Sequence, residues 1–262
     1  MYYFLYYKGG TFLISFIVSA IKIISLLGVL IFIHELGHFT VAKLCKVKVN
    51  EFAIGFGPTI LKKQGKETKY ALRLIPLGGF VSMEGEEERS ENEGSFSKAS
   101  IPKRIAIVTA GAGVNIIFAI IVFFFLATTV GNNMSFMECL KNAVVMTNEF
   151  IFSTIEGLKQ LLTGKVGIDQ MIGPVGISEV VSKTNGIKEF VYMLAAISMS
   201  LGVTNLLPIP ALDGGKIVLL IIEAIRRKPL NEKTEINIQL IGFSIIIALS
   251  LFVTYNDITR IF

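Results

Sequence analysis

The residues best suited to catalysis form one short motif, HELGH at 34–38, which ends an apolar run over 12–33. The motif holds the only two histidines of the 262-residue chain, His34 and His38. On a helix, positions i and i+4 share a face, so both imidazole rings can reach one metal ion. Glu35 then lies next to that ion, where its carboxylate can take a proton from a water molecule acidified by the metal. The spacing predicts metal-dependent hydrolysis.

Two other interpretations of this motif remain open. It can arise by chance, or the two histidines can serve as a hydrogen-bonded contact between helices. Ionisable groups within a membrane segment are costly, however, and usually mark function. The apolar stretch before the motif is long enough to cross a bilayer, so the chemistry is predicted at membrane depth.

Composition supports a membrane protein independently of the motif. The chain is 52% hydrophobic with a mean hydropathy of +0.65, far above the range of soluble domains. Apolar residues gather in four blocks, at 11–44, 101–130, 190–225 and 236–256. The first block is too long for a cleaved signal peptide. We therefore expect a mainly α, polytopic membrane protein with about four transmembrane helices, forming a single domain over 1–262.

The distribution of basic residues predicts the orientation. Lysine and arginine are abundant in 43–104 and 226–233 but sparse in 131–189. The positive-inside rule then places a β/loop region, 45–100, in the cytoplasm and an amphipathic region, 131–189, outside. Both termini are expected outside, with the motif near the cytoplasmic face. The pI of 9.1 mainly reflects these basic loops, and no nucleic-acid motif accompanies it, so no nucleic-acid partner is expected.

A third metal ligand is predicted far along the chain, in NLLPIPALDGG at 205–215. Two prolines break an apolar helix there, and such breaks survive at membrane depth only where protein or water covers them. Asp213 follows the break, and a carboxylate between apolar segments needs a partner such as a metal ion. The alternative is a solvated aspartate in an ordinary turn. Cys45 and Cys139, on opposite predicted sides of the membrane, are not expected to form a disulfide.

The segment after the first block has the alternation of β-strands. Strands are predicted over 47–54, 69–75 and 79–83, with turn signals at 57–58 and 64–66. A helical substrate must unwind before cleavage, and unwound backbone in lipid needs a pairing strand. An open sheet edge can supply that strand, which makes Gly79 and Phe80 candidate substrate-binding residues. A hairpin without a catalytic role is the alternative.

Together, HELGH and NLLPIPALDGG resemble the site-2 protease family of intramembrane zinc metalloproteases. The likeness extends to GFGP at 55–58, PLGGFV at 76–81 and GPVGI at 173–177, and is closest to the bacterial regulator-of-sigma-E branch. It implies that Zn²⁺ is bound by His34, His38 and Asp213, with Glu35 as general base. It also implies that Asn205 contacts the substrate or the reacting carbonyl.

The resemblance implies a substrate class and shows two departures. Expected substrates are single-span membrane proteins in the bilayer of a bacterial plasma membrane: anti-sigma factors, tethered regulators or remnant signal peptides. Relatives usually carry PDZ domains between the second and third blocks, whereas this chain has only about 60 residues there, 131–189, largely an amphipathic helix over 136–162. The second helix keeps Asn115 but lacks the proline that usually precedes it, which weakens any role for Asn115.

Two other functions compete with proteolysis. A membrane zinc transporter or scaffold would need a path of ligands, and no further histidine exists to build one. A sporulation-type protease acting on a pro-sigma factor would have a peripheral substrate. The acidic run over 83–97 is expected to be a solvated loop. Lys22, in the middle of the first span, can snorkel, pair with a carboxylate or line a water path.

Overall fold

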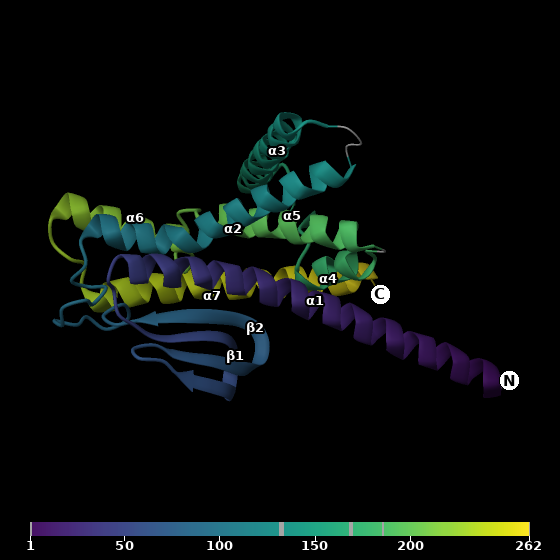
Figure 1. Ribbon diagram of the computed structural model, residues 1–262, viewed down its shortest axis with the longest axis horizontal. Coiled ribbons are helices and arrows are strands. Elements are labelled where there is room, and N and C mark those ends of the chain that lie inside the picture. The colour runs from purple at the N-terminus through teal and green to yellow at the C-terminus, as the bar shows by residue number, and fades with distance from the viewer. Residues whose placement is uncertain (1, 131–133, 168–169, 185, 262) are drawn as a thin grey trace.

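The computed structural model describes residues 2–130, 134–167, 170–184 and 186–261, and it is mainly helical (Figure 1). Helix α1 (Tyr2–Leu44) leads into strands β1 (Val49–Gln64) and β2 (Lys69–Met83). The helices that follow are α2 (Ile101–Val130), α3 (Phe136–Leu162), α4 (Pro174–Ser182), α5 (Ile187–Asn205), α6 (Asp213–Arg226) and α7 (Glu232–Ile261). The expected fold class, a helical membrane protein with a small β element after the first helix, is confirmed.

Four helices in the described part of the chain are long and apolar enough to span a membrane. These segments are 17–44, 101–129, 187–205 and 232–260. Many large apolar side chains of α7 are exposed, as a lipid-facing helix requires, including Leu240, Ile241, Phe243, Ile245 and Leu251.

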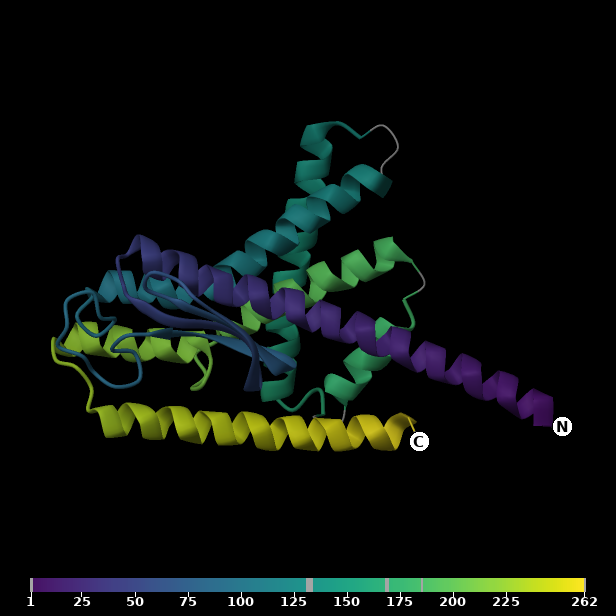
Figure 2. The same ribbon diagram turned by 60° about the horizontal axis from the view of Figure 1, so that its bottom comes forward.

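The third apolar block is divided between two helices. Helix α5 ends at Asn205, and α6 begins at Asp213 and continues in roughly the same direction (Figures 1 and 2). The intervening segment contains both prolines, which remove backbone donors and stop a helix. The break therefore places the first turn of α6, with its buried Gly214 and Gly215, inside the molecule beside residues 34–38 of α1.

Each strand folds back on itself, so that two strands build four paired segments. Phe52 of β1 pairs with Tyr70 on one side and with Val81 on the other, and Lys63 pairs with Tyr70. The first half of β1 is thus central, and 79–83 of β2 is an edge. Positive φ angles at Gly57 and Gly78 permit the bends. A turn was predicted at 57–58, but β1 continues through that bend to Gln64.

Three apolar clusters hold the helices together. One joins the end of α1 to the sheet, α2 and α6 through Val49, Phe52, Val81 and Ile107 among others. The others join α2 to α3 and α5, and α1 to α4 and α5. The first cluster lies next to the HELGH motif, so the sheet is packed against the helix end that carries the motif.

Short helix α4 is held between two longer helices by charged side chains. Lys22 of α1 donates to the carbonyl oxygen of Thr184 at 2.7 Å, just beyond the C-terminal end of α4. Asp257 of α7 accepts a hydrogen bond from the Gly176 amide at 2.8 Å, in the first turn of α4. Both charges have the sign that complements the helix dipole. Lys22 thus binds a backbone carbonyl, which was not among its expected roles.

Candidate metal centre

The structure brings together the three predicted metal ligands. His34 Nε2 lies 3.2 Å from His38 Nε2. Asp213 Oδ2 lies 3.3 Å from the first nitrogen and 3.5 Å from the second. Tetrahedral zinc sites with bonds of about 2.0–2.2 Å have ligand atoms about 3.3–3.6 Å apart. The three atoms are therefore spaced like three corners of a zinc coordination shell.

The state of Asp213 also fits a metal ion. Its Oδ2 is buried and makes no hydrogen bond within the described structure. A buried carboxylate oxygen without a donor is costly, and a cation supplies the missing partner. Two imidazoles and a carboxylate are the ligand types that catalytic zinc prefers, leaving one position open for water or substrate.

Backbone geometry before α6 brings Asp213 close to the histidines. Ala211 has a positive φ of 75°, which sharply redirects the chain before the helix. A Cβ on Gly214 would lie 2.2 Å from the Leu207 carbonyl oxygen, and one on Gly215 would lie 2.3 Å from the Ile209 carbonyl oxygen. Only glycines allow this loop to fold against the first turn of α6.

Helix α2 supplies the wall behind the two histidines. A Cβ on Gly111 would lie 2.3 Å from His38 Nε2 and 2.8 Å from His34 Cε1. A Cβ on Gly37 would lie 2.5 Å from the Ala110 carbonyl oxygen. Glycines on both helices therefore let α1 and α2 approach closely enough for the imidazoles to rest on α2.

The same helix contacts the other nitrogen of each histidine ring. His38 Nδ1 lies 2.8 Å from the Ile107 carbonyl oxygen, and His34 Nδ1 lies 3.2 Å from Asn115 Nδ2. The sequence did not predict the contact with the Ile107 carbonyl, and it gave little weight to a role for Asn115. The signal available in the sequence was an amide side chain within an apolar helix, four residues beyond Gly111.

The metal centre opens into a cavity of about 1470 Å³. Its wall includes the three predicted ligands, Glu35, and the edge segment 79–83 with Gly79 and Phe80. A Cβ on Gly79 would lie 3.1 Å from Glu35 Cγ, so the edge strand runs close to the predicted base. Asn205 ends α5 and is not among the described residues lining this cavity, so its contact with the reacting carbonyl stays a prediction.

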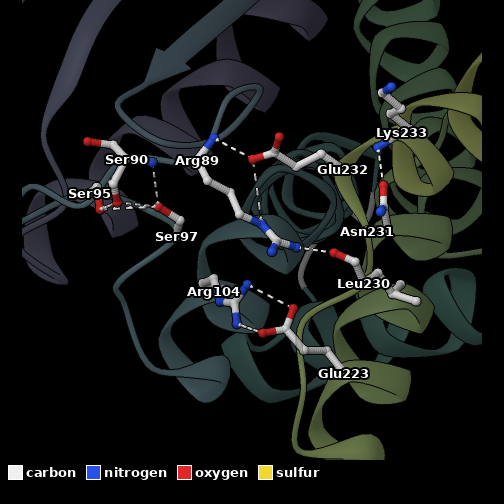
Figure 3. Close-up of polar contacts among 10 residues, drawn as sticks. All are labelled: Arg89, Ser90, Ser95, Ser97, Arg104, Glu223, Leu230, Asn231, Glu232 and Lys233. Carbon is white, nitrogen blue, oxygen red and sulfur yellow. Dashed lines mark hydrogen bonds and ion pairs between the residues drawn. The ribbon is translucent and has the colours of Figure 1, made fainter.

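The acidic run after β2 forms part of the cavity wall. Residues 84–91 line it, and Lys216 of α6 donates to Glu86 at 2.6 Å. Figure 3 shows Arg89 reaching the start of α7, where it binds the Glu232 carboxylate and the Leu230 carbonyl. The run is a loop with most of its acidic side chains exposed, as expected, and the contacts of Glu86 and Arg89 also tie it to α6 and α7.

Comparison with known proteins gives a consistent assignment. Residues 22–249 match the model of peptidase family M50. A protein of Clostridium acetobutylicum named as a zinc metalloprotease is 32% identical, over 88% of this chain and 94% of its own length. One of Fusobacterium nucleatum with the same description is 28% identical, over 90% and 97%. Zinc metalloprotease RasP of Bacillus licheniformis is 25% identical, over 93% and 99%.

These alignments also include segments that the present chain lacks. The alignment with the C. acetobutylicum protein extends over 320 positions, more than the 262 residues of this chain. The matched region nevertheless contains the HELGH motif and Asp213, the residues that the fold brings to one point. The chain therefore belongs to peptidase family M50, the site-2 protease family, and is a multi-pass membrane zinc metalloprotease.

Proposed function

We propose that the chain is an intramembrane endopeptidase that cleaves single-span membrane proteins, with His34, His38 and Asp213 as zinc ligands and Glu35 as general base. The main support is that one cavity contains the ligand triad, a non-ligand carboxylate and the edge of a β-sheet. Hydrolysis needs such a carboxylate beside the metal, whereas binding or transport of zinc does not.

The side chains have distinct chemical tasks. When bound, zinc supplies Lewis acidity, polarising a carbonyl and making water a nucleophile near neutral pH. Glu35 takes the proton of the attacking water and returns it to the leaving amine. Asn205 remains our candidate donor for the negative charge that develops on the carbonyl oxygen.

Edge segment 79–83 is the proposed docking strand for the substrate. Among described residues, it pairs on one side only, with the first half of β1, and its own residues line the cavity. An unwound substrate that adds to the free side gains backbone hydrogen bonds that lipid cannot provide. Gly79 and Phe80 would then contact the substrate next to Glu35.

Substrate class and orientation follow from the same features. The substrates proposed are anti-sigma factors, tethered regulators or remnant signal peptides in a bacterial plasma membrane, after another protease has trimmed them. The first described turn of α1 and the last of α7 lie toward one end, and the sheet loops and α6–α7 turn lie toward the other (Figure 1). We assign the first end to the outside, which puts the metal centre toward the cytoplasm. The whole chain then acts as one peptidase domain.

Activity is tested with protein purified in micelles and a panel of tagged single-span helices. We expect cleavage by the wild type and by a control variant, Glu156→Gln, because Glu156 is an exposed residue of α3. Glu35→Gln should give no products while still binding zinc, and a zinc chelator should stop the wild type. Cleavage that persists in Glu35→Gln would refute the assigned base.

Orientation is tested separately with a membrane-impermeant maleimide applied to intact cells. In a chain without its native cysteines, Glu156→Cys should label from outside, and Glu87→Cys only after the membrane is permeabilised. Labelling in the reverse order would overturn the proposed topology without affecting the assigned chemistry.

A further inference from the structure

We propose that Asn115 is a positioning residue for the metal centre: its side-chain amide fixes the tautomer and ring orientation of His34. This inference rests on the proposed assignment of His34 as a zinc ligand. The amide nitrogen of Asn115 lies 3.2 Å from Nδ1 of His34, on the opposite side of the ring from Nε2 and the triad.

The neutral imidazole has one proton, and its position decides whether the ring can bind a metal. With the amide nitrogen toward the ring, Asn115 Nδ2 donates to Nδ1, so the ring proton is on Nε2, which lies 3.3 Å from Asp213 Oδ2 but forms no hydrogen bond with it. Coordination through Nε2 requires that nitrogen to be unprotonated, so the proton must move to Nδ1. Nδ1 then becomes a donor and needs an acceptor.

The same amide can provide that acceptor. Its oxygen, Oδ1, is buried and makes no hydrogen bond within the described structure. Half a turn of the amide about its Cβ–Cγ bond exchanges oxygen and nitrogen with little change of shape. Asn115 thus pairs with His34 in both tautomers, by donating in the metal-free state and by accepting in the loaded state.

Packing holds the Asn115 side chain in place while its amide oxygen and nitrogen exchange positions. The Asn115 side chain is fully buried, and Ser198 Oγ of α5 donates to its backbone carbonyl at 2.9 Å. Ile107, Gly111 and Asn115 follow one another at four-residue steps along one face of α2. The first contacts His38, the second leaves room for both rings, and the third contacts His34. One helix face therefore orients both histidines.

The test exploits the presence of only two histidines in the chain. Protein labelled with ¹⁵N at histidine and purified through a histidine-free tag gives four ring-nitrogen signals. On zinc addition to wild type, both rings should show the Nδ1–H tautomer with slow proton exchange at Nδ1. A loaded His34 with its proton on Nε2 would overturn the role of Asn115. If neither ring responds to zinc, the ligand assignment itself fails.

Variants of Asn115 distinguish the role of its side chain as a hydrogen-bond acceptor from the effect of its volume. Asn115→Leu should weaken zinc binding about 10- to 100-fold, the usual effect of losing a hydrogen-bond partner of a metal ligand. It should also speed proton exchange at His34 Nδ1, while His38 remains unchanged as an internal reference. Asn115→Asp keeps an acceptor and should keep zinc affinity within a few fold. Thr109→Val, which removes a hydroxyl bonded within α2, is the control.

Two results of these titrations would contradict the inference. Zinc affinity and His34 exchange in Asn115→Leu equal to wild type would show that the ring needs no amide partner. If Asn115→Leu does not fold, Asn115→Asp decides alone: a loss of affinity with unchanged thermal stability would show that an acceptor at this position does not suffice.

Discussion

Arg104 of α2 and Glu223 of α6 form an ion pair in which both terminal guanidinium nitrogens donate to the carboxylate, Nη1 at 3.1 Å (Figure 3). The two side chains are only 11% and 16% exposed. Glu223 lies ten residues beyond Asp213 on α6, whereas α2 carries the surface on which the histidines rest. The pair therefore ties the helix of one predicted ligand to the helix that orients the other two.

Removing one partner of this pair should destabilise the protein and loosen the metal centre. Glu223→Gln removes the counter-charge of the largely covered Arg104, and loss of a hydrogen bond between charged groups typically costs roughly 1.5–3 kcal/mol. We expect a lower unfolding temperature in micelles and weaker zinc binding, because α6 carries Asp213. The exchanged pair Arg104→Glu/Glu223→Arg should recover part of both. Single variants as stable as wild type would show that the pair is dispensable.

Two glycines of α2 should respond oppositely to the same substitution. Gly111→Ala places a methyl group 2.3 Å from His38 Nε2, so the imidazoles must move and zinc binding should be lost. Gly113→Ala meets no atom within 4 Å and should stabilise the helix by about 0.5–1 kcal/mol. Zinc titration and thermal unfolding of both variants check this. Equal zinc affinity in the two would contradict the close packing of α2 on the motif.

The contacts at the two ends of α4 predict how this helix is held in place. Asp257→Leu removes the acceptor of the Gly176 amide, and Lys22→Met removes the donor to Thr184. Each variant should lower the unfolding temperature, since a charge that complements a helix end contributes about 0.3–2 kcal/mol. Asp257→Asn keeps an oxygen acceptor and should be affected less. Lys141→Met changes an exposed lysine of α3, which is not part of α4, and should match wild type.

The sequence was most informative where chemistry and periodicity coincide. HELGH and the Pro-interrupted segment before Asp213 identified three ligand candidates on two helices, and α3 begins and ends at the predicted residues 136 and 162. Such features are local: an i, i+4 pair, a helix-breaking proline and an amphipathic period. They need no knowledge of which helix lies next to which.

What the sequence left open depends on contacts between distant segments. Asn115 contacts His34 across 81 positions, and Lys22 contacts Thr184 across 162. Neither spacing has a period that one sequence can reveal. The acidic run is an exposed loop, as its composition indicates, but its anchoring contacts could not be foreseen for the same reason. Only the folded chain shows that Arg89 and Glu86 bind α7 and α6.

Glu84 is one anchor of the acidic loop, and its contribution should weaken as pH falls. Hydrogen bonds from Lys48, at 2.6 Å, and from Asn92 lower the pKa of Glu84 to about 2. Because its pKa is lowered, ionised Glu84 stabilises the folded loop at pH values above the ordinary pKa near 4.5. This stabilisation is lost as pH falls toward 2. Pepsin should therefore cut residues 85–97 faster across that interval. The ratio of wild-type to Glu84→Gln cleavage at each pH removes the pH dependence of pepsin itself. This ratio should rise toward one as pH falls, and a ratio independent of pH would disprove this anchor.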